Sequence, residues 1–298
     1  MATKKPTPAR DLKDVRHEID TIDDAIQDLL MKRTELVVEV AEAKARTASA
    51  AGQGSFIAFR PGREAEVLRR LAARQTGHFP LKVVFRLFRE IISTMTRIQG
   101  PFRVDVFGAE KKLAYWDLAR SYYGSSTEME LHDNARGVLQ RVAHDRSVVG
   151  ILPEPGNYAG GDWWPALAIA GKGGARVVAR LPFLDIASET DAPIALVVTQ
   201  AAFEPTGDDT SLLVVSTTDK VSEASIATRV KAVGFEGNRV SVVLTKDGGA
   251  SRHNLFAVHG HVAEDDARLA ALTSEGPAEI AIVIGGYANP VKRERDGQ

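Results

Sequence analysis

Apolar residues near the start of the chain repeat at helical steps of four and three. They are Val15, Ile19, Ile22, Ile26, Leu29, Leu36 and Val40. This spacing is typical of the seam of a long helix that packs lengthwise on another helix. With Asp11 available as its cap, the helix is predicted to begin near Leu12 and to end at about Arg46. Such a helix needs a packing partner along its length.

Two cations lie on the inward side of this helix. Arg33 fills the gap in the apolar repeat, and a guanidinium buried between helices is costly unless an anion meets it. Lys44 follows 11 residues later, about three helical turns, so the two side chains share a face. The pair predicts a buried anionic ligand. An ion pair of Arg33 with Glu39 or Glu42 is the alternative that needs no ligand.

Two shorter helices are expected next, because small residues and glycines over 47–55 indicate a loop. One helix is predicted from Pro61 to about Arg74, with proline in its first turn. The other is predicted from about Pro80 to Ile98, where Gly100 and the proline after it end the pattern. The first hundred residues are therefore predicted to be helical throughout.

The pattern changes after residue 100. Strand-like runs at 102–107, 147–152, 175–181 and 194–199 alternate with helical runs at 111–122 and 134–144. This alternation predicts a small α/β domain. Beyond a linker at 205–209, the order strand, helix, strand, strand, helix, strand predicts a ferredoxin-like sandwich over 211–284. The predicted domains are 11–100, 101–204 and 205–292, with disordered tails at 1–10 and 293–298.

Composition narrows the possible functions. The net charge of −1 provides no basic field for nucleic acid or a membrane surface, and the absence of cysteine excludes disulfides and thiolate chemistry. No apolar run reaches the ~18 residues that span a bilayer, and the basic start of the chain lacks the apolar stretch of a signal peptide. We therefore expect a cytoplasmic protein with no nucleic-acid or membrane partner. His259 and His261 lack a third ligand nearby, so no metal site is predicted, and Trp163-Trp164 is expected in the core or an interface.

Other polar residues accompany Arg33 and Lys44. Arg16 lies early in the first helix, Arg63-Glu64 opens the second, and Gln99 closes the third. Arg16 and Lys44 are 28 residues apart, about 42 Å along a straight helix, which one small molecule cannot bridge. If both bind the same kind of substrate, Arg16 serves a second site, most simply in a partner chain. This predicts a homodimer whose long helices lie side by side.

Residues 11–99 resemble the all-helical, type II chorismate mutase family, in the form that begins bifunctional chorismate mutase–prephenate dehydratase proteins. The matching segments are Leu12–Asp20, Lys32–Leu36, Ala43-Lys44, Arg63–Leu68 and Ile91–Gln99. The resemblance implies a three-helix domain, an intertwined dimer, and conversion of chorismate to prephenate in phenylalanine and tyrosine biosynthesis. It implies substrate binding by Arg16, Arg33, Lys44, Arg63, Glu64 and Gln99. The family pattern is broken at Arg60, where an acidic residue is usual, and at Met95, where a small hydroxyl is usual. Both changes are expected to affect substrate affinity more than the reaction.

The implied reaction is a pericyclic rearrangement, which requires no proton transfer, nucleophile, metal or cofactor. Catalysis then consists of holding the folded conformer of chorismate and stabilising the charge that grows on its ether oxygen. On this interpretation Arg33, with Arg16 from a second chain, clamps the carboxylates. Lys44 and Gln99 meet the ether oxygen, and Glu64 accepts a substrate hydroxyl. The expected catalytic residues are Lys44, Gln99 and Arg33.

The rest of the chain resembles the remainder of such bifunctional proteins in degenerate form. Residues 147–153 resemble a dehydratase segment, but Pro155 stands where its glutamate is expected, and the signature threonine-arginine-phenylalanine is absent near 193–195. The segment is also too short for a two-lobed dehydratase. Residues 208–290 resemble an ACT regulatory domain with altered ligand loops. A true bifunctional enzyme, or a non-catalytic aromatic-amino-acid sensor or scaffold, stay open as alternatives.

Overall fold

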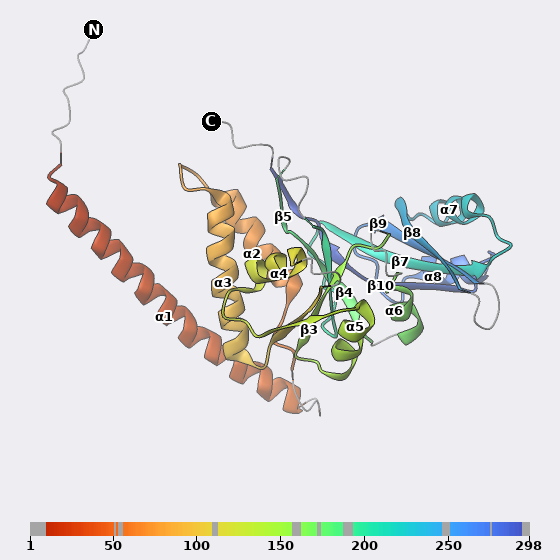
Figure 1. Cartoon of the computed structure of the whole chain (residues 1–298), viewed down its shortest axis with the longest axis horizontal. Coiled ribbons are helices and arrows are strands. Elements are labelled where there is room, and N and C mark those ends of the chain that lie inside the picture. The colour runs from red at the N-terminus through yellow and green to blue at the C-terminus, as the bar shows by residue number, and fades with distance from the viewer. Residues whose placement is uncertain are drawn as a thin grey trace, which may run out of the picture. The chain divides into compact units, whose positions relative to one another are not determined.

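A computed structural model of the chain describes residues 10–50, 52, 56–108, 113–156, 162–171, 174–186, 193–245, 251–274 and 276–293. The chain divides into two compact units, residues 1–56 and residues 57–298 (Figure 1). The tails predicted over 1–10 and 293–298 lie outside the described residues, apart from residues 10 and 293. None of the described helices combines the length and the apolarity that crossing a bilayer requires.

The first unit is one long helix, α1 (Leu12–Ala50), which begins where predicted and runs four residues beyond the predicted end at Arg46. Thr47 stays helical, its Oγ1 donating to the Ala43 carbonyl at 3.0 Å, and alanine is the strongest helix former. Apolar residues of the predicted seam are largely exposed: Leu29 is 66% exposed and Leu36 is 53% exposed. An apolar stripe of this kind on a helix is typical of an interaction surface.

The second unit begins with two helices, α2 (Pro61–Arg74) and α3 (Leu81–Gln99). The bounds of α2 are those predicted, with Pro61 in the first turn. The bounds of α3 differ from the prediction by one residue at each end, within the ordinary fraying of helix termini. Its apolar side is strongly segregated, with Phe85 and Ile92 among its buried residues.

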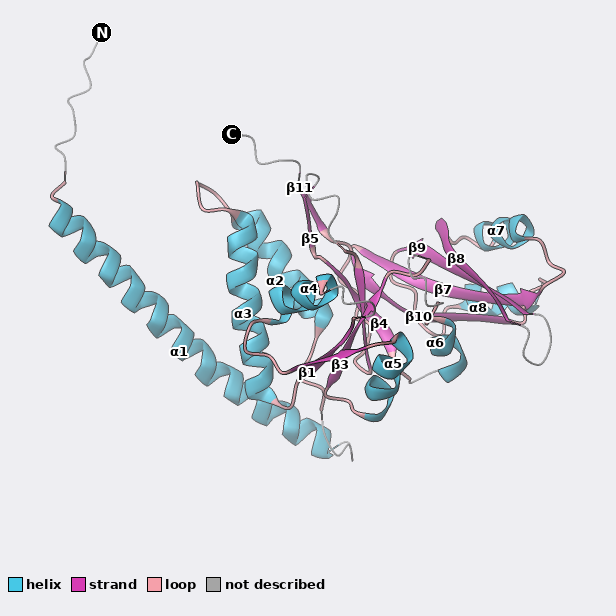
Figure 2. Cartoon of the chain, in the orientation of Figure 1, coloured by secondary structure: helices cyan, strands magenta, loops and turns pink. Residues whose placement is uncertain are grey.

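A nine-stranded mixed sheet follows, in the order β2-β1-β3-β6-β4-β10-β7-β9-β8. Figure 2 shows strands in magenta and helices in cyan. The first part of the sheet contains β1 (Arg103–Phe107), β2 (Met129–His132), β3 (Val148–Pro153), β4 (Arg176–Leu181) and β6 (Ala195–Thr199). Strand β1 pairs in parallel with β2 and β3, whereas β6 is antiparallel to β3 and β4. The helices of this part are α4 (Ala114–Tyr123), α5 (Ala135–His144) and α6 (Pro165–Ala170).

Three short elements of this part were not predicted: β2, α6 and β5 (Leu184–Ile186). Strand β2 has only four residues, two of them exposed, so it lacks an apolar run. Helix α6 has six residues, too few to show a helical period. The predicted positions of Trp163 and Trp164 in the core are confirmed, since both are buried and their indoles donate to the Pro153 carbonyl and Ser241 Oγ at 2.9 and 3.3 Å.

The second part of the sheet contains β7 (Asp209–Thr218), β8 (Gly237–Thr245), β9 (Ser251–His259) and β10 (Ile280–Ala288). Helices α7 (Glu223–Ala232) and α8 (Ala267–Ser274) complete it, so the predicted succession strand, helix, strand, strand, helix, strand is confirmed. All three pairings among these strands are antiparallel.

The two parts are continuous, whereas the sequence indicates two separate sheets. Gly285 of β10 pairs with Val177 of β4, and a short C-terminal strand, β11 (Val291–Arg293), pairs with β5. Gly285 has φ of +106°, and a Cβ there would lie 2.0 Å from the Val177 carbonyl oxygen, so only glycine fits this junction. The boundaries 101–204 and 205–292 stay a prediction.

Helices α2 and α3 share a hydrophobic core with the sheet. One cluster of buried side chains includes Phe59, Leu68 and Phe85 from the helical segment and Ile151 and Val197 from the strands. Other contacts join the same elements. Arg60 pairs with Glu204 at 2.7 Å, and Arg69 Nη2 donates to the carbonyls of Asp208 and Asn289 at 2.6 and 2.9 Å. The two short helices therefore pack on the sheet as part of the second unit, and the predicted domain 11–100 stays a prediction.

Candidate functional site

Helix α1 carries three of the predicted site residues. Arg16 is exposed, while Arg33 and Lys44 are half-buried. Arg33 and Lys44 share one face, because the less exposed residues of the second half of α1 lie at 30, 33, 34, 37, 41, 44 and 48. The predicted common face of Arg33 and Lys44 is therefore confirmed, although it is rotated away from the exposed Leu29 and Leu36.

The two cations differ in their surroundings. Nη1 of Arg33 is buried and has no hydrogen-bond partner among the residues the structure describes, and burial lowers the pKa of Arg33. The alternative ion pairs of Arg33 with Glu39 and Glu42 are absent from the described part of the chain, and Glu42 instead lies 3.8 Å from Arg46. Lys44 Nζ lies 5.5 Å from the ring centroid of Phe56, a cation–π contact.

The Arg-Glu pair at the start of α2 consists of one exposed and one buried side chain. Arg63 is exposed and pairs with Glu66 at 2.8 Å. Glu64 is only 6% exposed, and its Oε2 accepts from Arg89 Nη1 at 2.7 Å. The carboxylate expected to meet a substrate hydroxyl is thus held inside the second unit by an arginine of α3.

Arg89 is the functional candidate that the sequence analysis missed. Its Nε donates to the Tyr122 carbonyl at 2.7 Å, and its guanidinium carbon lies 3.6 Å from the centroid of the Tyr122 ring. Burial opposes the charge, but Glu64 and the adjacent tyrosines outweigh it, and the pKa of Arg89 is raised. The sequence contains an indication of this role. Arg89 lies between Phe85 and Ile92 on the apolar side of α3, much as Arg33 interrupts the apolar pattern of α1.

Gln99 ends α3 and is half-buried. Its Nε2 donates to the Met95 carbonyl at 3.2 Å, and the Met95 side chain is buried. Of the six predicted site residues, Arg63, Glu64 and Gln99 belong to the second unit, and Arg16, Arg33 and Lys44 belong to the first. Their convergence on one substrate stays a prediction.

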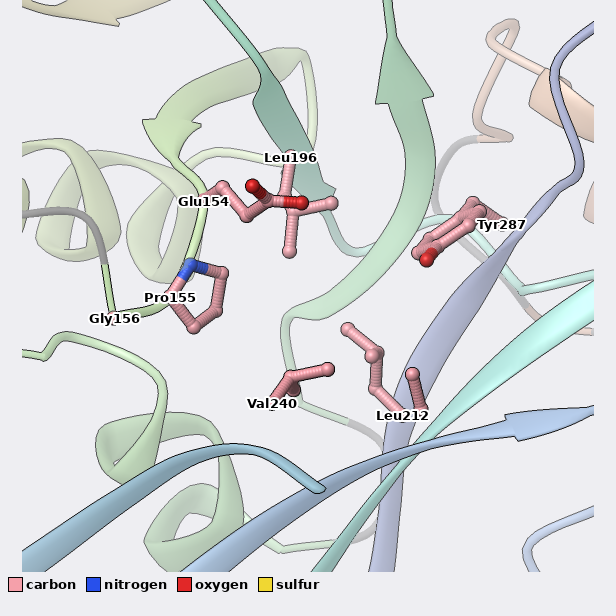
Figure 3. A pocket seen from close by; sticks show the side chains of 8 residues that line it. Glu154, Pro155, Gly156, Leu196, Leu212, Val240 and Tyr287 are labelled. Atoms are coloured by element: carbon pink, nitrogen blue, oxygen red, sulfur yellow. The ribbon is translucent and has the colours of Figure 1, made fainter. Parts of the chain in front are cut away.

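A cavity of about 290 Å³ lies at the carboxyl end of β3, where Glu154 and Pro155 follow the strand (Figure 3). Leu196, Leu212 and Val240 give it an apolar side, and the Tyr287 hydroxyl and the Glu154 carboxylate are among its polar groups (Figure 3). Arg180 Nε lies 4.0 Å from Glu154, and burial raises the pKa of Tyr287. Glu154 and Tyr287 also line a neighbouring, more polar cavity of about 760 Å³, which His259 borders.

A charged cluster lies at the β1–β2 edge of the sheet. Asp105, Glu130 and His132 bring one ligand atom each within 4.8 Å of one another. Two guanidinium groups already neutralise it: Arg141 Nε lies 3.3 Å from Asp105, and Arg103 Nη2 lies 2.8 Å from Glu130. The cluster is therefore charge-compensated by protein groups, and a cation would have to compete with both arginines.

Comparisons with known proteins give matches to solved structures and to curated sequences. The solved structures align at low similarity. The prephenate dehydratase from Streptococcus mutans aligns with a TM-score of 0.47 and 13% identity over 64% of this chain and 100% of that chain. GqqA, described as a novel type of quorum quenching acylase, aligns with a TM-score of 0.47 and 14% identity over 63% of this chain and 94% of that chain.

Curated sequence relatives match a third to a half of this chain. The bifunctional chorismate mutase/prephenate dehydratase of Stutzerimonas stutzeri is 36% identical over 102 residues, which are 34% of this chain and 27% of that protein. The protein of the same description from Pseudomonas aeruginosa is 31% identical over 146 residues, 48% of this chain and 38% of that protein. The chain thus matches well under half the length of these relatives. Residues 15–100 match the family model described as chorismate mutase type II.

Proposed function

We propose that the protein is a chorismate mutase, which rearranges chorismate to prephenate without a cofactor. The observation that carries the proposal is the half-buried face of α1 with Arg33 and Lys44 inside the segment that matches the family. Nη1 of Arg33 is buried without a hydrogen-bond partner in the described part of the chain. A buried donor of this kind is expensive alone and is satisfied by a substrate carboxylate.

The chemistry follows from charge and position. Arg33 binds a carboxylate of chorismate through parallel N–H donors, which restricts the substrate to its reactive, folded conformer. Lys44 and Gln99 donate to the ether oxygen, where negative charge grows as the C–O bond breaks. The reaction involves no proton transfer, so Arg33 does not act as an acid or a base. Burial lowers its pKa, and the guanidinium is required only to stay charged.

Glu64 has a defined place in this scheme. Arg89 holds Oε2 of Glu64, whereas Oε1 has no hydrogen-bond partner among the residues that the structure describes. A substrate hydroxyl can donate to Oε1 while the Arg89 pair keeps the carboxylate charged and oriented. The buried ion pair therefore supports a substrate-orienting role for Glu64 rather than a role in proton transfer.

The activity is tested by following the ultraviolet absorbance of chorismate with the purified full chain. We expect its loss well above the spontaneous rate, with prephenate as the product. No loss above the spontaneous rate at micromolar enzyme would contradict the proposal and favour the non-catalytic scaffold or aromatic-amino-acid sensor.

We also infer a cytoplasmic homodimer in which Arg16 serves the site of the second chain. The exposed apolar residues of α1, including Ile22 and Leu29, support a helix–helix interface along its length.

The strand order β10-β7-β9-β8 supports an ACT-like domain over 205–292, and the segment 101–204 is proposed to be a degenerate dehydratase-like domain. The expected boundary of the mutase domain is 11–100.

Subunit exchange tests the placement of Arg16. Arg16→Ala and Arg33→Ala proteins are each expected to be inactive, because each site loses one carboxylate clamp. A mixture that has exchanged subunits should regain activity, since each heterodimer contains one intact site. Exchange is monitored with differently tagged chains, and no recovery despite complete exchange would contradict the proposed role of Arg16 across the interface.

The reaction is expected to stop at prephenate. A dehydratase must expel water and carbon dioxide, which requires a positioned acid in an enclosed cleft. In this chain Pro155 occupies the expected glutamate position, and the threonine-arginine-phenylalanine signature is absent. Incubation with prephenate at neutral pH should yield phenylpyruvate only at the spontaneous rate. Phenylpyruvate formed faster by the full chain, and not by a Glu154→Gln variant, would establish the bifunctional alternative.

A further inference from the structure

A third cavity, of about 530 Å³, lies within the second unit between α3, α4 and the chain around β5. Its lining is mainly apolar and includes Phe85 from α3, Leu118 from α4, and Phe183 and Leu184 from the segment after β4. Phe85 and Phe183 also stack on each other, with ring centroids 6.4 Å apart and an interplanar angle of 20°. A concave apolar wall of this size fits a small organic molecule.

The charged groups of the cavity come mostly from one side of α3. Lys82, Arg86 and Arg89 line it at helical steps of four and three, so they form one row. Asp117 of α4 is the single acidic residue among the lining residues that the structure describes. An apolar wall beside three cations and one anion is complementary to an apolar molecule that carries negative charge.

Arg89 supplies the strongest indication of a ligand. The residue is 2% exposed, and two of its three nitrogens are satisfied: Nη1 donates to Glu64 and Nε donates to the Tyr122 carbonyl. Nη2 is buried and has no hydrogen-bond partner within the described ranges. An orphaned donor on a buried cation is rare in folded proteins, and it calls for an acceptor from outside the chain.

We propose that this cavity binds a small organic monocarboxylate with an apolar or aromatic body. Its carboxylate oxygen accepts from Arg89 Nη2, and its body packs on Phe85, Leu118 and Phe183. Arg86 and Lys82, both exposed at the rim, add electrostatic attraction. The site uses none of the six residues proposed to bind chorismate, so the inference goes beyond the proposed function.

Isothermal titration of the full chain with 3-phenylpropionate tests the proposal. We expect saturable binding of one molecule per chain. Two matched ligands isolate the charge: 3-phenylpropanol has the same body without charge, and 3-phenylpropylamine has the opposite charge. Both should bind at least about tenfold more weakly, because they leave Nη2 of Arg89 without an acceptor. The heat of binding does not depend on turnover, so this result is separable from the mutase assay.

Three variants test whether the ligand binds in this cavity. Ser121→Trp fills the cavity from exposed Ser121 of α4 and should abolish binding, while Arg86→Gln should weaken it about threefold to tenfold. Arg120→Gln removes the same charge from an exposed position outside the cavity and should bind normally. Ala114→Phe replaces Ser121→Trp if that variant does not melt like the wild type. Absence of saturable binding, or equal binding by the wild type and both the filling and the rim variants, would overturn the proposal.

Discussion

Replacing Arg33 or Lys44 with alanine lowers kcat/KM for chorismate by about 100-fold or more. Each side chain is expected to stabilise charge on the substrate, and loss of one positioned donor typically costs a factor of 10²–10³. Arg33 clamps a carboxylate, so its loss also releases the folded conformer. Initial rates of chorismate consumption over a range of substrate concentrations measure the effect.

The matched control is Lys32→Ala. Lys32 is an exposed cation on the same helix, one residue from Arg33 and outside its half-buried face. It should retain nearly full activity, and all three variants should keep the helical circular dichroism of the wild type. If Arg33→Ala or Lys44→Ala kept near wild-type kcat/KM, the assignment of the active site to this face of α1 would be wrong.

Replacing Arg89 with methionine should destabilise the second unit by about 3–5 kcal/mol. Methionine fills much of the same volume, but it leaves the Glu64 carboxylate buried without its partner. Urea unfolding at neutral pH measures the loss of stability.

Two further variants separate charge from packing. The double variant Glu64→Leu/Arg89→Met removes both charges and should recover most of the lost stability, since a buried ion pair is often replaceable by apolar residues. Arg86→Met makes the same change at an exposed position of α3 and should alter stability by less than about 0.5 kcal/mol. Equal destabilisation by the double variant and by Arg89→Met would show that the guanidinium acts by packing on Tyr122, not by compensating Glu64.

Long periodic elements were predictable because the residues that specify them are close together in the sequence. Helix α2 matches its prediction because Pro61 and a helical apolar pattern specify it without reference to distant residues. Strand β2 and helix α6 were missed because they are short and take their stability from neighbours in the fold. The two sheets join where Gly285 pairs with Val177 and where β11 pairs with β5, contacts that no local pattern indicates.

The candidate site was predictable in part for a similar reason. A cation that interrupts an apolar helix face is visible in sequence, and this identified Arg33. Whether such a cation is already paired inside the protein depends on a residue far along the chain. Arg33 has a buried Nη1 without a partner among the described residues, whereas Arg89 meets Glu64, 25 positions earlier. Sequence analysis assigned Glu64 to substrate without its arginine, because that partner is known only from the packing of α2 on α3.

The common core of α2, α3 and the sheet also affects how the chain folds during its synthesis. Phe59, Leu68 and Phe85 leave the ribosome early, but Ala288 of the same core is made about 200 residues later. At about 5–20 residues per second, the two helices wait on the order of 10–40 s for their last partners. Most of the other core residues, including Ile151 and Val197, are made earlier, and until then the apolar sides of the two helices are open to other chains and to chaperones. Nascent chains stalled before β3 should therefore hold α2 and α3 in a protease-sensitive state, and synthesis through β6 should largely end it.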